Sequence, residues 1–190
     1  MFREPNSKNH PIVFRAVIVL SFILFAAIVR ILPHPWNFTP VGAMALFSGA
    51  KLGRSWKSFF FPVAALFVGD CFVGFHKLMP FVYFSFCLSI LIGIAIRQRQ
   101  SPKLISAATF LGALQFFLIT NFAVWAMLTA YPHTPAGLLT CYIAGLPFFG
   151  NTLAGDGFYS VLLFGGFALL ERLNPALRAI AVPVLSRQGD

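Results

Sequence analysis

Long apolar runs separated by short polar connections make up the chain from Ile12 to Leu170. A helix rises about 1.5 Å per residue and needs about 20 mostly apolar residues to cross a bilayer. Five runs approach that length, and a shorter one starts at Pro40, which suits a first helical turn behind the capping residue Thr39. The pattern predicts an all-α integral membrane protein with six transmembrane helices. The predicted helices are residues 12–32, 40–52, 59–75, 81–96, 104–127 and 152–170.

A seventh stretch, residues 135–150, has a less regular composition than the apolar runs around it. It contains Gly137, Gly145, Pro147 and Gly150, and glycine and proline are the two residues least suited to a helix interior. We therefore predict an interfacial or re-entrant segment here. The predicted domain organisation is a tail at 1–11, a single six-helix membrane domain at 12–171 and a second tail at 172–190.

The composition agrees with a protein embedded in lipid. Apolar residues make up 58% of the 190 residues and charged residues 10%, whereas soluble domains average about 45–50% and about 25%. This balance excludes a soluble enzyme, a secreted disulfide scaffold and a disordered tail. The net charge of +9 would suit nucleic acid, so the positions of the basic residues decide what that charge means.

The basic residues fall on alternate connections between the predicted helices. Twelve flank one side of the predicted bilayer, and only Arg30 and Lys77 flank the other. Short loops rich in Lys and Arg stay in the cytoplasm, so we predict an inner-membrane protein with both termini cytoplasmic. Charges spread loop by loop form no folded basic face, and no nucleic-acid partner is expected. The twelve residues are Arg3, Lys8, Arg15, Lys51, Arg54, Lys57, Arg97, Arg99, Lys103, Arg172, Arg178 and Arg187.

Polar residues of the last four predicted helices and their outer connections converge on one depth in this orientation. The inner halves are almost purely apolar, whereas the outer halves carry two aspartates. A charged side chain at the bilayer centre costs about 2.5–3.5 kcal/mol even on insertion scales, so these aspartates are expected to face the protein interior. We predict a pocket for a small, vitamin-like molecule that opens outward, and a function in binding or uptake. The candidate ligand-binding residues are Asp70, His76, Tyr83, Asn121, Trp125, Asn151, Asp156 and Tyr159.

Two other interpretations of the aspartates stay open. Asp70 could pair with His76 or Lys77, and Asp156 could cap a helix start beside its neighbouring glycines; such pairing and a pocket do not exclude each other. Without a pocket large enough for a metabolite between the last four predicted helices, the chain would be a non-catalytic structural or assembly protein. Alternatively, the two aspartates could share a proton and activate water, as in an intramembrane aspartyl protease. The Gly-x-Gly-Asp signature is absent, so we expect no catalytic residues.

Small residues and cysteines add narrower predictions. Ala45, Gly49 and Gly53 recur every four positions, a spacing that permits close helix contact in membranes. Cys71 and Cys87 lie in apolar surroundings without metal-ligand spacing. We expect them to be small buried hydrophobes, with a reactive or metal-binding thiol as the weaker alternative. The sequence has no cofactor motif, and no cofactor is expected.

Three stretches carry a resemblance to known membrane proteins. They are LPHPWNFTPVGAMALFSGA (32–50), GDCFVGFHKLMPFVYFSF (69–86) and TNFAVWAM with PFFGNTLAGD (120–127 and 147–156). They resemble an uncharacterised family of conserved bacterial membrane proteins. In length and predicted architecture, the chain is also similar to the substrate-binding S-components of energy-coupling-factor (ECF) vitamin transporters. That resemblance implies a six-helix bundle, a ligand pocket near the outer face and an energising membrane partner.

Overall fold

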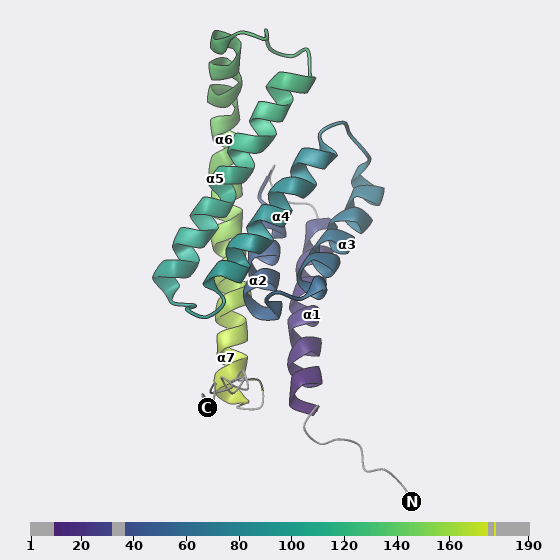
Figure 1. Cartoon of the computed structure of the whole chain (residues 1–190), viewed down its shortest axis with the longest axis vertical. Helices are drawn as coiled ribbons and strands as arrows, with labels where there is room; N and C mark the ends of the chain where they lie inside the picture. Colours follow the sequence, from purple (N-terminus) through teal and green to yellow (C-terminus); the bar gives the residue numbers. More distant parts are fainter. Residues whose placement is uncertain (1–9, 32–36, 175–176, 178–190) are drawn as a thin grey trace, which may run out of the picture.

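A computed structural model describes residues 10–31, 37–174 and 177 of the chain. This part consists of helices and their connections, without a strand, which confirms the predicted all-α class. A π-helical turn, η1 (Val161–Gly165), joins the sixth helix to the seventh, so one uninterrupted helix runs from Pro135 to Leu173. The α-helices (Figure 1) are α1 (His10–Ile31), α2 (Val41–Leu52), α3 (Trp56–Val73), α4 (Met79–Ile96), α5 (Pro102–Met127), α6 (Pro135–Ser160) and α7 (Gly166–Leu173).

The helices form two antiparallel hairpins, α3–α4 and α5–α6, with α1 and α2 packed against them (Figure 1). The start of α1, the end of α7 and the connections α2–α3 and α4–α5 lie toward the lower end of the molecule in this view. The connections α3–α4 and α5–α6 lie toward the upper end. Basic residues such as Arg54 and Arg97 therefore share the lower end, which we call the basic end.

Three helices in the described part are long and apolar enough to cross a membrane: α4, α5 and the helix Pro135–Leu173. The shorter α2 has 12 residues and is also apolar. Large apolar side chains are exposed along the bundle, among them Phe72 and Val161, each with 72% of its surface accessible. Extensive exposed apolar surface is uncommon in soluble monomers, so both the helices and the surface are of a membrane type.

The uninterrupted helix from Pro135 differs from the interfacial segment predicted for residues 135–150. Pro135 occupies the first turn, where a missing N–H costs little, and the Thr134 side chain caps that turn by accepting from the Gly137 N–H at 3.1 Å. Gly145 allows α5 to come close, because a Cβ there would lie 2.5 Å from Asn121 Oδ1. Pro135 thus serves the helix start and Gly145 a helix contact, and the glycines and prolines of this segment do not end the helix.

Helix α2 lies at the centre of the bundle and contacts α1, α3, α4, α5 and α6. Nine of its twelve residues are buried, so protein surrounds most of its surface. The Phe47 ring is fully buried and packs against the rings of Phe22, Phe164 and Phe167 at centroid distances of 5.3–5.7 Å. Aromatic contacts of this geometry contribute about 0.5–1.5 kcal/mol each beyond burial. They hold α2 against α1 and against the helix Pro135–Leu173, which we call the last helix.

Helices α2 and α4 cross at two glycines. A Cβ on Gly49 would lie 2.1 Å from the Ile90 carbonyl oxygen, and a Cβ on Gly93 would lie 2.1 Å from the Leu46 carbonyl oxygen. Each backbone therefore occupies the space that a side chain on the other helix would need.

The other two residues of the predicted small-residue pattern have different surroundings. Ala45 is fully buried. Gly53 ends α2 with φ of +66°, a left-handed conformation that favours glycine.

Replacing either crossing glycine by alanine should destabilise the protein. The added methyl group meets backbone, which cannot yield, and overpacking of this kind costs about 1–3 kcal/mol. Gly49→Ala and Gly93→Ala should each lower the thermal midpoint of the purified protein in detergent. Gly150→Ala is the matched control, because a Cβ there has no atom within 4 Å, and alanine favours helix by up to about 1 kcal/mol. Equal midpoints for all three variants would contradict the close crossing.

Candidate functional site

Asp70 is the centre of a buried polar cluster that joins α1, α3 and α4. Its side chain is 5% exposed, and its Oδ1 lies 2.6 Å from Arg30 Nη2. The Tyr83 hydroxyl donates to Asp70 Oδ2 at 2.7 Å, and Arg30 Nη1 donates to the Leu66 carbonyl at 2.9 Å. Asp70 therefore pairs with an arginine on another helix and not with His76 or Lys77. An opposite charge at this distance offsets much of the cost of burying the carboxylate.

Asp156 caps the N-terminus of a helix other than its own. Asp156 is a residue of α6, and its Oδ1 accepts a hydrogen bond of 3.1 Å from the N–H of Ala43, in the first turn of α2. Pro40, at the N-cap of α2, makes no side-chain cap. A carboxylate satisfies the unpaired N–H groups and suits the positive end of the helix dipole. Gly42 makes room, since a Cβ there would lie 2.4 Å from both carboxylate oxygens.

The other predicted ligand residues have separate surroundings. The Asn121 amide donates to Phe117 O on its own helix at 2.9 Å, and Trp125 Nε1 donates to Pro132 O at 2.9 Å in the α5–α6 connection. Tyr159 is buried, with its ring 5.8 Å from that of Phe38. His76 and Asn151 are exposed. A hydrogen bond joins Asp70 and Tyr83, two of the eight predicted residues, directly.

Thiols and carboxylates in the described part are dispersed. Cys71 is exposed, Cys87 is half-buried, and Cys141 is buried with its Sγ 3.4 Å from Asn121 O. The described residues include no group of three or more His, Cys, Asp or Glu placed to hold a metal ion. Asp70 binds Arg30 and Tyr83, whereas Asp156 binds the start of α2. The two carboxylates thus have different partners, which does not favour the protease alternative.

A cavity of about 530 Å³ lies between α5 and the last helix, toward the basic end. The pocket predicted from the sequence lies in the outer half, and none of the eight predicted residues lines this cavity. Its volume falls within the range of about 300–1,000 Å³ that small-molecule sites occupy. The lining residues are Lys51, Gln100, Pro102, Ile105, Ser106, Thr109, Leu153, Gly157, Ser160, Val161, Phe164, Gly165, Ala168 and Glu171.

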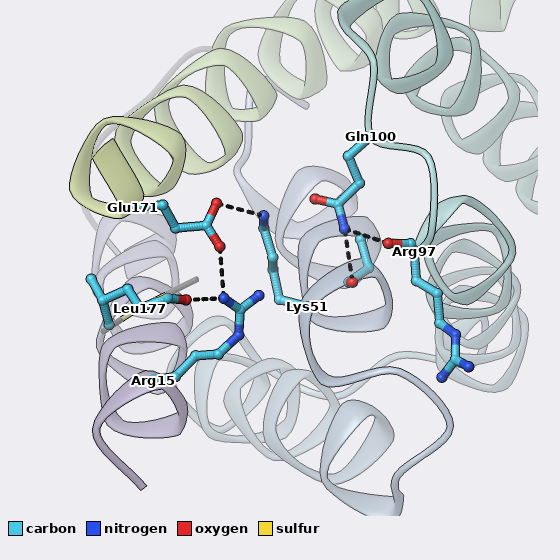
Figure 2. Close-up of polar contacts among 7 residues, drawn as sticks. Arg15, Lys51, Arg97, Gln100, Glu171 and Leu177 are labelled. Atoms are coloured by element: carbon cyan, nitrogen blue, oxygen red, sulfur yellow. Dashed lines mark hydrogen bonds and ion pairs between the residues drawn. The ribbon is translucent and has the colours of Figure 1, made fainter. Parts of the chain in front are cut away.

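A charged cluster that includes the lining residues Lys51 and Glu171 lies at the basic end of the cavity (Figure 2). The Glu171 carboxylate lies between two cations, with Oε1 2.6 Å from Arg15 Nη1 and Oε2 3.9 Å from Lys51 Nζ. Arg15 Nη1 also donates to the Leu177 carbonyl. The Lys51 ammonium lies 4.4 Å from the centroid of the Phe167 ring, within the distance of a cation–π contact. This cluster joins α1, α2 and α7.

The remaining wall of the cavity is mostly apolar, and one side of it is a π-helical turn. The π-helical turn η1 contributes Val161, Phe164 and Gly165, and π-helical turns in α-helices are frequent at functional sites. Gly157 and Gly165 leave open space, because a Cβ on either would have no atom within 4 Å. An apolar chamber with buried charges at one end can hold an amphiphilic small molecule. A sequence signal for it was present in the small residues spaced along 157–168 and in the rare acidic residue Glu171.

The bundle and the cavity define a helical protein of membrane type with a chamber that has charged side chains at one end. Residues 11–177 match the model of a family described as a family of unknown function, DUF6580, and the chain belongs to this family. No curated protein and no solved structure matches the chain.

Removing the Asp70 carboxylate should weaken the bundle more than removing the Tyr83 hydroxyl. Breaking a buried ion pair costs about 3–5 kcal/mol when one partner is removed, and Asp70→Asn should approach the lower value because Arg30 is 15% exposed. Tyr83→Phe should cost about 1.5 kcal/mol, and Tyr142→Phe, which loses a bond to the neutral Leu118 carbonyl, about 1 kcal/mol or less. Unfolding in detergent measures the order, and a reversed order would contradict the ion pair's role.

Proposed function

We propose that the chain spans an inner membrane six times, with both termini in the cytoplasm. The basic residues of alternate connections lie toward one end of the bundle (Figure 1), and this end would be cytoplasmic under the positive-inside rule. The short helix α2, preceded by residues 37–40, would form the second span. Under this proposal the chamber lies in the cytoplasmic half of the bilayer.

We propose that the protein binds a small molecule in this chamber, as a binding or uptake component of the membrane. The observation that supports the proposal is a chamber of about 530 Å³ between α5 and the last helix, with the buried Lys51 ammonium and the partly exposed Glu171 carboxylate at one end. Uptake with an energising membrane partner, which the resemblance to ECF S-components implies, is part of this proposal, although that resemblance implies a pocket near the outer face and the chamber lies toward the basic end.

The proposed function is the one expected from the sequence, but the proposed ligand site is at the basic end and not in the outer half. In the outer half, a hollow of about 500 Å³ lies between α4, α5 and α6, lined by apolar side chains and Tyr142. The Tyr142 hydroxyl already donates to Leu118 O at 2.9 Å. Specific sites need a few convergent polar groups to fix a ligand, and the chamber at the basic end meets that requirement better.

Filling the chamber should remove the bound molecule. Gly157→Leu and Gly165→Leu each place a side chain in space that is open in the wild type, so both proteins should fold. Native mass spectrometry of the purified wild type should detect a co-purified small molecule that both variants lose. Gly150→Leu is the matched control, with the same substitution on α6 in open space outside the chamber, and it should keep the molecule. A wild type that retains no molecule would favour a structural or assembly role.

The topology can be tested with single cysteines in a variant that lacks Cys71, Cys87 and Cys141. A cysteine at Arg99, in the α4–α5 connection, should be protected from a membrane-impermeant thiol reagent in intact cells. A cysteine at Thr129, in the α5–α6 connection, should react. Reaction at position 99 with protection at 129 would reverse the proposed orientation, and reaction at both would overturn the span count.

A further inference from the structure

Lys51 brings a positive charge to the chamber that the protein itself neutralises only in part. Its side chain is 6% exposed, and its Nζ lies 3.9 Å from the Glu171 carboxylate, beyond the 2.7–3.2 Å of a hydrogen bond. Glu171 makes its shorter contact, 2.6 Å, with Arg15. The three side chains together carry one net positive charge. A buried ammonium with three donors that faces a chamber favours a ligand that accepts hydrogen bonds.

The end of α2 does not need Lys51 as a cap. The Gly49 carbonyl accepts from the Gly53 N–H at 3.0 Å, and the Ala50 carbonyl accepts from the Gln100 amide at 3.1 Å. The Gly53 carbonyl accepts from the Ser58 hydroxyl at 2.6 Å. Cations are often placed at helix C-termini to bind such carbonyls. Because these three already have donors, the Lys51 ammonium is available to another acceptor.

Other polar groups of the chamber wall already have hydrogen-bond partners within the protein. The Gln100 amide nitrogen donates to Ala50 O and to Arg97 O (Figure 2). The hydroxyls of Thr109 and Ser160 lie 3.0 Å apart and share a hydrogen bond. Lys51 is the one cation among the lining residues. Ser106 and the second hydroxyl of the Thr109–Ser160 pair are neutral donors, which bind an anion more weakly than an ammonium does.

The remaining lining residues suit an apolar body. Ile105 and Leu153 line the chamber, and the lining residues Val161 and Ala168 have exposed side chains. In a bilayer, exposed side chains of this kind contact lipid. The chamber therefore has a charged end at the membrane boundary and an apolar wall that reaches the lipid, the two environments of an amphiphile.

We infer that the chamber takes an amphiphile from the membrane with one anionic oxygen headgroup, a carboxylate or a phosphate, held by the Lys51 ammonium. The apolar part of the molecule lies along α5 and η1. This inference rests on the proposed small-molecule function and names the chemical class of its ligand. A monoanion would balance the single net charge of Arg15, Lys51 and Glu171.

The test compares four probes that share one alkyl chain: dodecanoate, dodecyl phosphate, dodecanol and dodecylamine. Binding to the full-length protein in phosphatidylcholine nanodiscs is measured by native mass spectrometry. The preferred anion should bind at least about tenfold more tightly than the alcohol, because hydrogen bonds to charged groups are the stronger ones. A preference for dodecanoate identifies a carboxylate ligand and one for dodecyl phosphate a phosphate ligand. Equal binding of all four probes would overturn the inference.

Variants of the charged end assign the preference to Lys51. Lys51→Met should lower the anion's affinity to that of dodecanol and leave dodecanol unchanged, and it retains the Arg15–Glu171 ion pair for folding. Lys57→Met is the matched control, since Lys57 is exposed and lies outside the chamber, and its anion preference should equal that of the wild type. If Lys51→Met does not fold, Glu171→Gln should tighten anion binding by removing the competing carboxylate. Unchanged anion binding in both variants would overturn the inference.

The same experiment separates failure of this inference from failure of the proposed function. If dodecanol and dodecylamine bind as well as the anions and Gly157→Leu blocks them, the chamber is a ligand site without the inferred headgroup preference. If no probe binds the wild type and no co-purified molecule is found, both the ligand class and the proposed function are wrong.

Discussion

The backbone of the short helix α2 places the strongest constraint on the structure. Its 12 residues span about 18 Å, less than the roughly 30 Å hydrocarbon core of a bilayer. Its ends are packed in the bundle, and in a bilayer each unsatisfied terminal N–H or C=O group would cost several kcal/mol. Asp156 meets the N-terminus, while Gln100 binds a carbonyl at the C-terminus. The last helix and the α4–α5 connection are held against α2 by these contacts.

Much of the fold could be predicted from the apolar runs. The fourth and fifth predicted helices, 81–96 and 104–127, agree closely with α4 and α5, because the runs are long and Ser101 caps α5 at a sharp boundary. The sequence failed at residues 135–150, where glycine and proline suggested an interruption. A local pattern cannot show whether a glycine breaks a helix or lets another helix approach, as Gly145 does toward Asn121.

The candidate site could be predicted only in part. The sequence identified Asp70 and Asp156 as carboxylates that should avoid lipid, but their partners lie 40 and 113 residues away. Lys51 counted toward the orientation of the membrane protein, and nothing in its immediate sequence indicates that its side chain is buried beside Glu171. The chamber is formed by α2, α5 and the last helix together, so its position depends on packing that periodicity does not encode.

The helix from Pro135 to Leu173 has a consequence for how the protein meets a bilayer. Its 39 residues measure about 58 Å along the axis, almost twice the roughly 30 Å of hydrocarbon. Tilt alone would have to reach about 60°, beyond the 0–40° range of membrane helices. Part of this helix must therefore extend past the hydrocarbon. The tip of the α5–α6 hairpin projects beyond that of α3–α4 (Figure 1), and the polar groups of Trp125 and His133 at that tip suit the water-facing headgroup layer.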